Sequence, residues 1–322
     1  MPVSEDKPAL DAILQKVLEA VPFQLTTDGG ADAARQRFRD LPRQPVHQEV
    51  RAEDRTIAGV PVRLYWPPDV TDPPVVMFLH GGGWVVGDLD TYDGTARGHA
   101  VGAGALVVSV DYRLAPEHPF PAAVDDVWAV TRWVAEHGRE LGADPKRLAV
   151  AGDSAGGNLA AVVAQLARDT GVDLRLQLLW YPATTWDTSL PSFTENADAP
   201  ILALDAVGQF STWYAGHVDM REAPATLIPA RGDLSGLAPA YIAVAGHDPL
   251  RDDGVEYGAM LRASGVAAEV HIAPTLVHGY LGYAGIVPAA TEATDRGLAA
   301  LRAALSDESA PVPPVPDNAA PA

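Results

Sequence analysis

The spacing of apolar residues changes along the chain and predicts an α/β fold. Residues 46–66 alternate apolar and polar positions around Ala58-Gly59, which indicates a β-hairpin. Residues 75–79 and 106–110 are continuous apolar runs, typical of strands that are covered on both faces of a sheet. An opening antiparallel hairpin followed by alternating strands and helices predicts one mainly parallel, twisted sheet with helices on both faces.

Apolar positions at helical spacing predict the helices that cover this sheet. The segment from Leu10 to Ala20 places its leucine, isoleucine and valine residues on one face. Further helices are predicted at residues 31–38, 122–137, 158–167, 254–264 and 289–305, and further strands at residues 147–151, 176–179, 241–245 and 270–272.

Two segments depart from the alternation of strands and helices. Residues 184–230 carry Trp186, Phe210 and Trp213 among prolines and acids, and we interpret this segment as an insertion. These aromatic residues could line a pocket, although ordinary packing is the favoured interpretation. Residues 306–322 are rich in proline, alanine and acids, which predicts a disordered tail.

The composition narrows the class of protein. Of the 322 residues 48% are apolar, but no apolar run approaches the length that crosses a bilayer. Residues 1–7 carry acids and have no apolar core behind them, so they do not form a signal peptide. Because the chain has no cysteine, disulfides and thiolate chemistry are excluded, and the expected location is cytoplasmic.

The charge and the missing motifs argue against several partners. A formal net charge of −19 disfavours binding to nucleic-acid phosphates and to anionic membranes, and it favours neutral substrates. The chain has neither a His-Glu-x-x-His helix nor a dinucleotide-binding glycine fingerprint. We therefore expect no metal, no organic cofactor, no nucleic-acid partner and no membrane partner.

The pentapeptide Gly152-Asp153-Ser154-Ala155-Gly156 fits the Gly-x-Ser-x-Gly nucleophile elbow. Such an elbow holds a serine on a sharp turn between a strand and a helix, and it needs small residues where the backbone is crowded. The flanking residues predict that strand and that helix. Ser154 is therefore the candidate nucleophile.

A serine nucleophile needs a histidine base, and the base needs an orienting acid. In proteins with a Gly-x-Ser-x-Gly elbow, the acid and then the histidine follow the serine along the chain. The histidines after Ser154 are His217, His247, His271 and His278. His217 lies in the insertion and His271 inside a predicted strand, whereas His278 follows that strand in a loop, so we choose His278 as the base.

Asp248 is the candidate acid. It follows the apolar run 241–245, at the carboxyl end of a predicted parallel strand, where open α/β sheets place their sites. Asp252 and Asp253 compete with it, although Asp252 is better suited to a helix start. Helix capping is the alternative role for Asp248 itself, and Asp248 alone does not decide between the two.

The tetrahedral intermediate of acyl transfer also needs N–H donors for its negative oxygen. The segment His80-Gly81-Gly82-Gly83-Trp84 follows the predicted strand 75–79 and matches the HGGG-type motif. Consecutive glycines let backbone amides face a ligand without a Cβ in the way. Ala155, directly after the candidate nucleophile, would supply a further N–H.

Together these motifs closely resemble those of the bacterial hormone-sensitive-lipase-like esterases, in the Gly-Asp-Ser-Ala-Gly branch, which have an α/β-hydrolase fold. The resemblance runs from about Leu10 to Leu305. The matching segments are residues 80–88 (HGGGWVVGD), 111–123 (DYRLAPEHPFPAA), 152–158 (GDSAGGN), 248–252 (DPLRD) and 278–279 (HG).

The resemblance implies specific roles and a specific domain organisation. The implied site residues are the nucleophile Ser154, the acid Asp248, the base His278, the oxyanion donors Gly82, Gly83 and Ala155, and Gly81 as support for the turn. A helical cap is implied at residues 1–45 and 184–230, around a catalytic core of residues 46–183 and 231–305. Relatives of this branch often form dimers, so a homodimer is a further expectation.

The leading hypothesis for the function is a serine carboxylesterase that acts through an acyl-enzyme intermediate. The resemblance implies short- to medium-chain acyl esters as substrates. An amidase or peptidase stays open, since both leaving groups use the same acid–base relay. A non-catalytic small-molecule receptor is a third hypothesis, and the complete set of three triad residues argues against it.

Overall fold

The computed structural model describes residues 7–306 and contains an eight-stranded sheet. The strands are β1 (Arg51–Ile57), β2 (Val60–Trp66), β3 (Pro74–Leu79), β4 (Leu106–Val110), β5 (Asp144–Asp153), β6 (Gln177–Trp180), β7 (Ala240–His247) and β8 (Ala268–Val277). Their spatial order is β1-β2-β4-β3-β5-β6-β7-β8. The β1–β2 hairpin is antiparallel, β2 joins β4 in antiparallel fashion, and β3 to β8 run parallel. The predicted mainly parallel sheet with an opening hairpin is confirmed.

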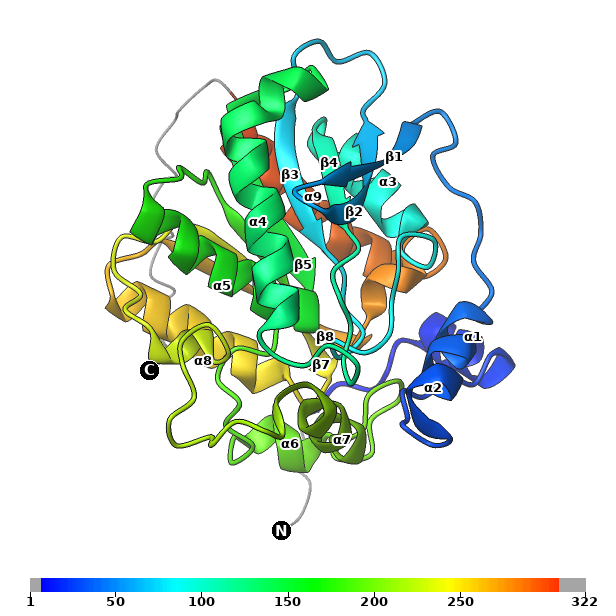
Figure 1. Cartoon of the computed structure of the whole chain (residues 1–322). Helices are drawn as coiled ribbons and strands as arrows, with labels where there is room; N and C mark the ends of the chain where they lie inside the picture. The colour runs from blue at the N-terminus through cyan, green and yellow to red at the C-terminus, as the bar shows by residue number, and fades with distance from the viewer. Residues whose placement is uncertain (1–6, 307–322) are drawn as a thin grey trace, which may run out of the picture.

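Helices cover both faces of this sheet (Figure 1). One face is packed by α4 (Ala122–His137), α5 (Ala155–Thr170) and α8 (Arg251–Ala263), and the other by α3 (Asp93–Ala103) and α9 (Pro288–Leu305). In β3, Val75 and Met77 belong to the first core, and Val76 and Phe78 belong to the second. Successive side chains point to opposite faces, so a strand between two helical layers is apolar throughout.

The apolar pattern does not predict α3. This helix turns small side chains toward the core, among them Ala96 and Ala100, and it packs on α9. A Cβ on Gly102 would lie 2.5 Å from the Leu298 side chain, so the two helices approach closely. Close packing of small residues leaves little hydrophobic periodicity in the sequence.

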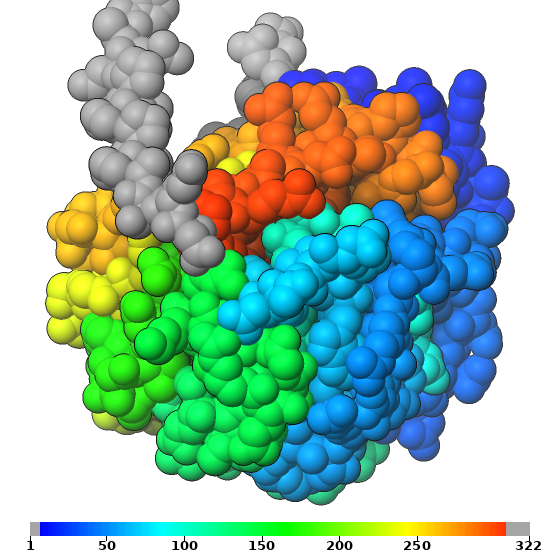
Figure 2. Space-filling view, turned by 90° about the horizontal axis from the view of Figure 1, so that it is seen from above, coloured from blue at the N-terminus to red at the C-terminus, as the bar shows by residue number. Residues whose placement is uncertain are grey.

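The segments predicted as cap helices gather at one end of the sheet (Figure 1). They are α1 (Ala12–Ala20), α2 (Gly30–Arg39), α6 (Pro191–Glu195) and α7 (Leu204–Ala215). The N–H of Leu25 donates to the carbonyl of Ile201 at 2.8 Å, so the N-terminal segment and the insertion lie side by side. Figure 2 looks at the opposite end of the molecule, where α9 (orange to red), the α4–β5 region (green) and the β1–β2 hairpin (blue) form the surface.

The described residues do not cover both ends of the chain. Residues 1–6, at the start of the predicted cap, lie outside them, as do residues 307–322, which make up nearly all of the predicted tail. Within residues 7–306, none of the helices has both the length and the apolar character needed to cross a membrane. The same described part of the chain also contains three short 3-10 helices: η1 (Gly138–Leu141), η2 (Pro229–Arg231) and η3 (Tyr280–Tyr283).

Candidate active site

Ser154 lies at the turn between β5 and α5. Its φ of 55° is in the left-handed region, and its N–H donates to the carbonyl of Trp180 at 2.8 Å. A Cβ on Gly152 would lie 2.2 Å from the carbonyl oxygen of Gly156, and a Cβ on Gly156 would lie 1.9 Å from that of Leu79. Atoms do not approach so closely, so the turn requires glycine at both positions. This strained backbone presents the Ser154 hydroxyl at the carboxyl end of the sheet.

Hydrogen bonds join Ser154, His278 and Asp248. His278 Nδ1 lies 2.7 Å from Asp248 Oδ2, and His278 Nε2 lies 2.9 Å from Ser154 Oγ. Because a carboxylate only accepts, Nδ1 carries the proton and donates to Asp248, and Nε2 accepts from the Ser154 hydroxyl. Asp248 is fully buried and His278 is 3% exposed, so water competes little for these bonds. The arrangement is suited to removing a proton from Ser154.

Asp248 has both of the roles considered for it, helix cap and orienting acid, and each role uses one of its two carboxylate oxygens. Oδ1 accepts from the N–H of Leu250 at 2.8 Å, and Leu250 is the residue directly before α8. Oδ2 accepts from His278. One carboxylate therefore holds the start of a helix and orients the imidazole at the same time.

The competing acids have other partners. Asp252 Oδ2 accepts from the N–H of Ser192 at 2.8 Å, at the start of α6. Asp253 Oδ1 accepts from the hydroxyl of Thr184 at 2.6 Å. Both carboxylates thus attach the insertion to α8.

The other histidines after Ser154 lie in other elements or have other partners. His271 is inside β8, as predicted for it, and His217 follows α7 in the insertion. His247 ends β7, and its Nε2 donates to the carbonyl of Pro8 at 3.0 Å.

The glycine turn after β3 borders the same cavity as Ser154. Gly82 and Gly83 have φ values of 102° and 60°. A Cβ on Gly82 would lie 2.3 Å from the carbonyl oxygen of Val86. Gly83 and Ala155 line the cavity beside Ser154. The turn is therefore placed to direct backbone amides toward a group bound at Ser154.

The cavity beside Ser154 has a volume of about 180 Å³ and mainly apolar walls. Leu25 lines it from the N-terminal segment, and Trp186 and Phe210 line it from the insertion. For Trp186 and Phe210 the favoured interpretation as packing alone is therefore incomplete. Trp213 instead contacts the Phe210 ring edge-on, with centroids 6.0 Å apart.

Asp153 and Tyr92 are part of this site, although the motif analysis assigns no role to either residue. The Asp153 carboxylate accepts from the N–H of Gly81 at 2.8 Å and from the Tyr92 hydroxyl at 3.1 Å. Burial raises the pKa of Asp153 to about 6. An ionisable residue at the variable position of a buried elbow is the one signal that could have pointed to it.

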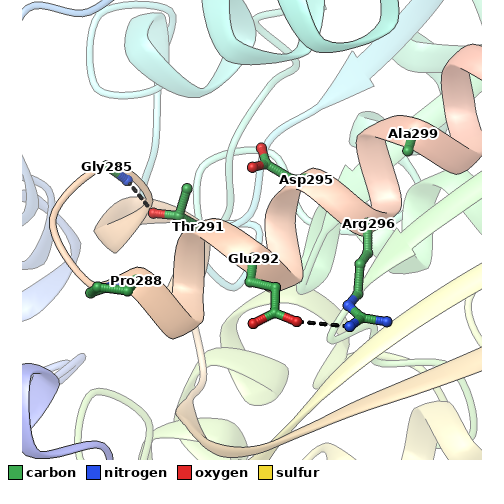
Figure 3. A pocket seen from close by; sticks show the side chains of 7 residues that line it. All are labelled: Gly285, Pro288, Thr291, Glu292, Asp295, Arg296 and Ala299. Carbon is green, nitrogen blue, oxygen red and sulfur yellow. Dashed lines mark hydrogen bonds and ion pairs between the residues drawn. The ribbon is translucent and has the colours of Figure 1, made fainter.

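A second hollow lies along α9 and the loop before it (Figure 3), and it shares no lining residue with the cavity beside Ser154. It is lined by Gly285, Pro288, Thr291, Glu292, Asp295, Arg296 and Ala299. Glu292 and Arg296 form an ion pair across successive turns of the helix. Among residues 7–306, no group of three or more histidine, aspartate or glutamate side chains is arranged to hold a metal ion.

Comparisons with known proteins agree with this architecture. A family model described as alpha/beta hydrolase fold matches residues 76–282. Esterase LipI of Mycobacterium tuberculosis is 64% identical over 94% of this chain and 97% of its own length. Carboxylesterase NlhH of the same species is 56% identical over 93% of this chain and 97% of its own length. The crystal structure of DphMB1 superposes with a TM-score of 0.92 at 75% identity, covering 92% of this chain and 99% of that one.

Proposed function

This chain belongs to the hormone-sensitive-lipase-like carboxylesterases of the α/β-hydrolase fold, and we propose that it hydrolyses short- to medium-chain acyl esters through an acyl-enzyme on Ser154. The observation that carries the proposal is the continuous hydrogen-bonded path from Ser154 Oγ through His278 to Asp248. Such a path activates a hydroxyl that is otherwise a weak nucleophile at neutral pH.

The reaction has two steps. His278 Nε2 takes the proton as Ser154 Oγ attacks the ester carbonyl, and the imidazolium then protonates the departing alcohol. Water attacks the acyl-enzyme with the same base, which releases the acid and restores Ser154. In both steps the amides of Gly82, Gly83 and Ala155 stabilise the negative oxygen. Asp248 holds the imidazole in the tautomer that the first step needs.

The cavity favours short acyl chains. Its volume of about 180 Å³ lies below the range of pockets that bury drug-sized ligands. Apolar walls suit an alkyl chain and disfavour a charged group. The names of the relatives, esterase and carboxylesterase, point to the same bond class.

We propose that residues 7–45, the described part of the predicted N-terminal cap, and residues 184–230 form the cap over this cavity. Leu25 from the first segment and Trp186, Leu204 and Phe210 from the second line it, which supports that role. Self-association and a cytoplasmic location stay predictions.

Replacing Ser154 by alanine tests the mechanism. We expect Ser154→Ala to reduce hydrolysis of p-nitrophenyl butyrate by about 10⁶-fold, because it removes the attacking atom. The matched control is Ser235→Ala, since Ser235 is an exposed serine whose hydroxyl donates to Asp233. Labelling by a fluorophosphonate should occur in the wild-type chain and in the control but not in Ser154→Ala. Turnover by Ser154→Ala at the wild-type rate would refute the proposal, and faster cleavage of the matched anilide than of the ester would make the chain an amidase.

A further inference from the structure

The buried carboxylate of Asp153 contacts the oxyanion turn directly. Its Oδ1 accepts from the N–H of Gly81 at 2.8 Å, and its Oδ2 accepts from the Tyr92 hydroxyl at 3.1 Å. A Cβ on Gly81 would lie 2.5 Å from Oδ2, so the turn and the carboxylate are in close contact. Asp153, the residue before the nucleophile, is therefore bonded directly to Gly81, the residue before the proposed oxyanion donors.

The reaction leaves this carboxylate without a chemical role. Asp153 is 4% exposed, and burial disfavours its charged form. A neutral apolar residue would avoid that penalty. The two hydrogen bonds that the carboxylate accepts are the part of its environment that offsets the penalty. Their common effect is to hold the Gly81 amide.

We propose that Asp153 and Tyr92 form a positioning pair for the oxyanion turn. In this pair Tyr92 fixes the rotamer of Asp153, and Asp153 fixes the Gly81 amide, so that the next two amides keep their direction toward Ser154. The inference rests on the proposed function, because it concerns the donors used by that reaction. Neither residue lines the cavity beside Ser154, so the pair acts on the turn and not on a bound ester.

The other side of the turn is held in the same way. The Tyr112 hydroxyl donates to the carbonyl of His80 at 2.7 Å, and the Tyr112 ring stacks on the His80 ring with centroids 4.3 Å apart. His80 Nδ1 donates to the carbonyl of Gly81 at 2.8 Å. The two peptide groups that lead into the oxyanion glycines are therefore held by buried polar side chains on both sides.

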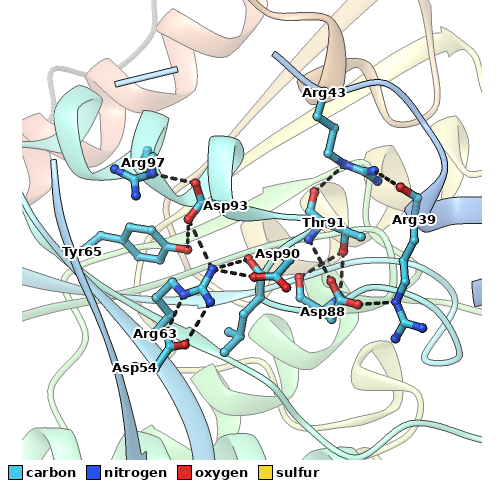
Figure 4. Close-up of polar contacts among 11 residues, drawn as sticks. Arg39, Arg43, Asp54, Arg63, Tyr65, Asp88, Asp90, Thr91, Asp93 and Arg97 are labelled. Atoms are coloured by element: carbon cyan, nitrogen blue, oxygen red, sulfur yellow. Dashed lines mark hydrogen bonds and ion pairs between the residues drawn. The ribbon is translucent and has the colours of Figure 1, made fainter. Parts of the chain in front are cut away.

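Tyr92 is held in turn by the N-terminal helix α2. The Phe38 ring stacks on the Tyr92 ring with centroids 6.0 Å apart. Figure 4 shows Arg39 paired with Asp88 and Arg43 donating to the carbonyl of Thr91. These contacts reach Asp88 and Thr91, the first and the last of the four residues before Tyr92.

Within that segment the chain closes a small turn on itself. Asp88 Oδ1 accepts from the N–H of Thr91 at 2.8 Å, and the Thr91 hydroxyl accepts from the N–H of Asp88 at 2.9 Å. Because Tyr92 directly follows this turn, the turn sets the direction of the backbone at Tyr92. Support from α2 thus reaches the oxyanion turn through Tyr92 and Asp153.

Tyr92→Phe tests the pair because it removes one hydroxyl and keeps the ring. Its matched control is Tyr65→Phe, since the Tyr65 hydroxyl also donates to a carboxylate, that of Asp93, at 2.9 Å (Figure 4). Asp93 contacts Arg63 and Arg97 rather than the oxyanion turn. We expect Tyr92→Phe to lower kcat for p-nitrophenyl butyrate by about 5- to 50-fold with KM little changed, less than removal of a whole oxyanion donor. Tyr65→Phe should leave kcat within about twofold.

A transition-state analogue separates positioning from general loss of structure. An alkyl trifluoromethyl ketone forms an adduct with serine that carries an oxyanion, so its affinity reports the oxyanion site. The affinity should fall in Tyr92→Phe by the same factor as kcat/KM, and it should be unchanged in Tyr65→Phe. Asp153→Asn keeps an acceptor for Gly81, so it should retain more activity than Asp153→Ala.

The double variant gives the decisive comparison. If the two residues act through one path, Tyr92→Phe combined with Asp153→Asn should lose little more kcat than the worse single variant. Wild-type kcat and analogue affinity in folded Tyr92→Phe and Asp153→Asn would overturn the pair, as would equal losses in Tyr65→Phe. Ester turnover that survives Ser154→Ala would instead overturn the proposed function, so the two failures are distinguishable.

Discussion

The two halves of the proposed active site are built in opposite ways. The relay half consists of side chains: Asp248 and His278 leave the ends of β7 and β8 and meet through hydrogen bonds of 2.7 and 2.9 Å to each other and to Ser154. The proposed oxyanion half consists of backbone: Gly82 and Gly83 turn with positive φ, and the buried Asp153 side chain accepts from the N–H of the preceding residue, Gly81.

This difference determines how each half fails. The relay depends on which atoms carry protons, so a change of one atom at constant shape should disable it. The oxyanion half depends on the direction of backbone N–H groups, which do not differ in chemistry from glycine to alanine, so added volume should disable it at constant chemistry. A substitution that changes one of these properties and leaves the other alone therefore separates the two halves.

The largest effect is expected at the relay acid. Asp248→Asn preserves the shape but presents an NH₂ group or a neutral oxygen to His278, which favours the wrong tautomer. We expect kcat for p-nitrophenyl butyrate to fall by about 10⁴-fold with KM nearly unchanged. Asp252→Asn, in the first turn of α8, is the control and should stay within a few-fold of wild type. A loss of less than tenfold in Asp248→Asn would show that the acid is misassigned.

Added volume at the oxyanion turn should have the next largest effect. In Gly82→Ala the new methyl would lie 2.3 Å from the Val86 carbonyl oxygen, so the turn must move. We expect kcat to fall by about 10²- to 10³-fold, as when an oxyanion donor is lost.

Gly59→Ala is the matched control for Gly82→Ala. Its φ is 84°, and its Cβ would meet nothing within 4 Å. It should lower the free energy of unfolding by about 1–2 kcal/mol, measured by urea denaturation, and leave kcat unchanged. Equal losses of kcat in the two variants would indicate that backbone strain, rather than the position of the turn, sets activity.

The buried charge in the oxyanion half should appear in the pH dependence of stability. Burial raises the pKa of Asp153 from 3.8 to about 6, so the folded chain holds this proton where the unfolded chain has released it. The stability that this group contributes is complete below the unfolded pKa and is lost as the pH rises through the folded pKa. From pH 4 to pH 8, Asp153→Asn should therefore gain about 2 kcal/mol in free energy of unfolding relative to wild type.

Urea denaturation of both chains at the two pH values measures this gain. Other titrating groups are shared by the two chains and cancel in the comparison. A difference between Asp153→Asn and wild type that does not change with pH would show that Asp153 titrates normally.

The same contrast explains what the sequence could predict. Asp248 and His278 can be predicted from the sequence because their order along the chain and their positions after strand ends do not require knowledge of packing. The core strands can also be predicted, because β3 and β4 are apolar on both faces and appear as continuous apolar runs in the sequence. The contact between Tyr92 and Asp153 depends on how residues 88–92 pack against the elbow, and no local pattern encodes that. The apolar pattern does not predict helix α3 for a related reason: the helix packs through small residues, which leave little hydrophobic periodicity.

The smallest effect is expected where the support for the oxyanion half reaches the surface. The Arg39 and Asp88 side chains are 53% and 23% exposed, and such ion pairs contribute little stability. In Arg39→Ala the bonds between Asp88 and Thr91 and the contact of Phe38 with Tyr92 persist. We therefore expect kcat to change by less than about twofold, and 0.5 M salt, which screens such pairs, should affect wild type and variant alike. A loss as large as that of Tyr92→Phe would instead mean that α2 controls the turn through charge, and the buried contacts would then be secondary.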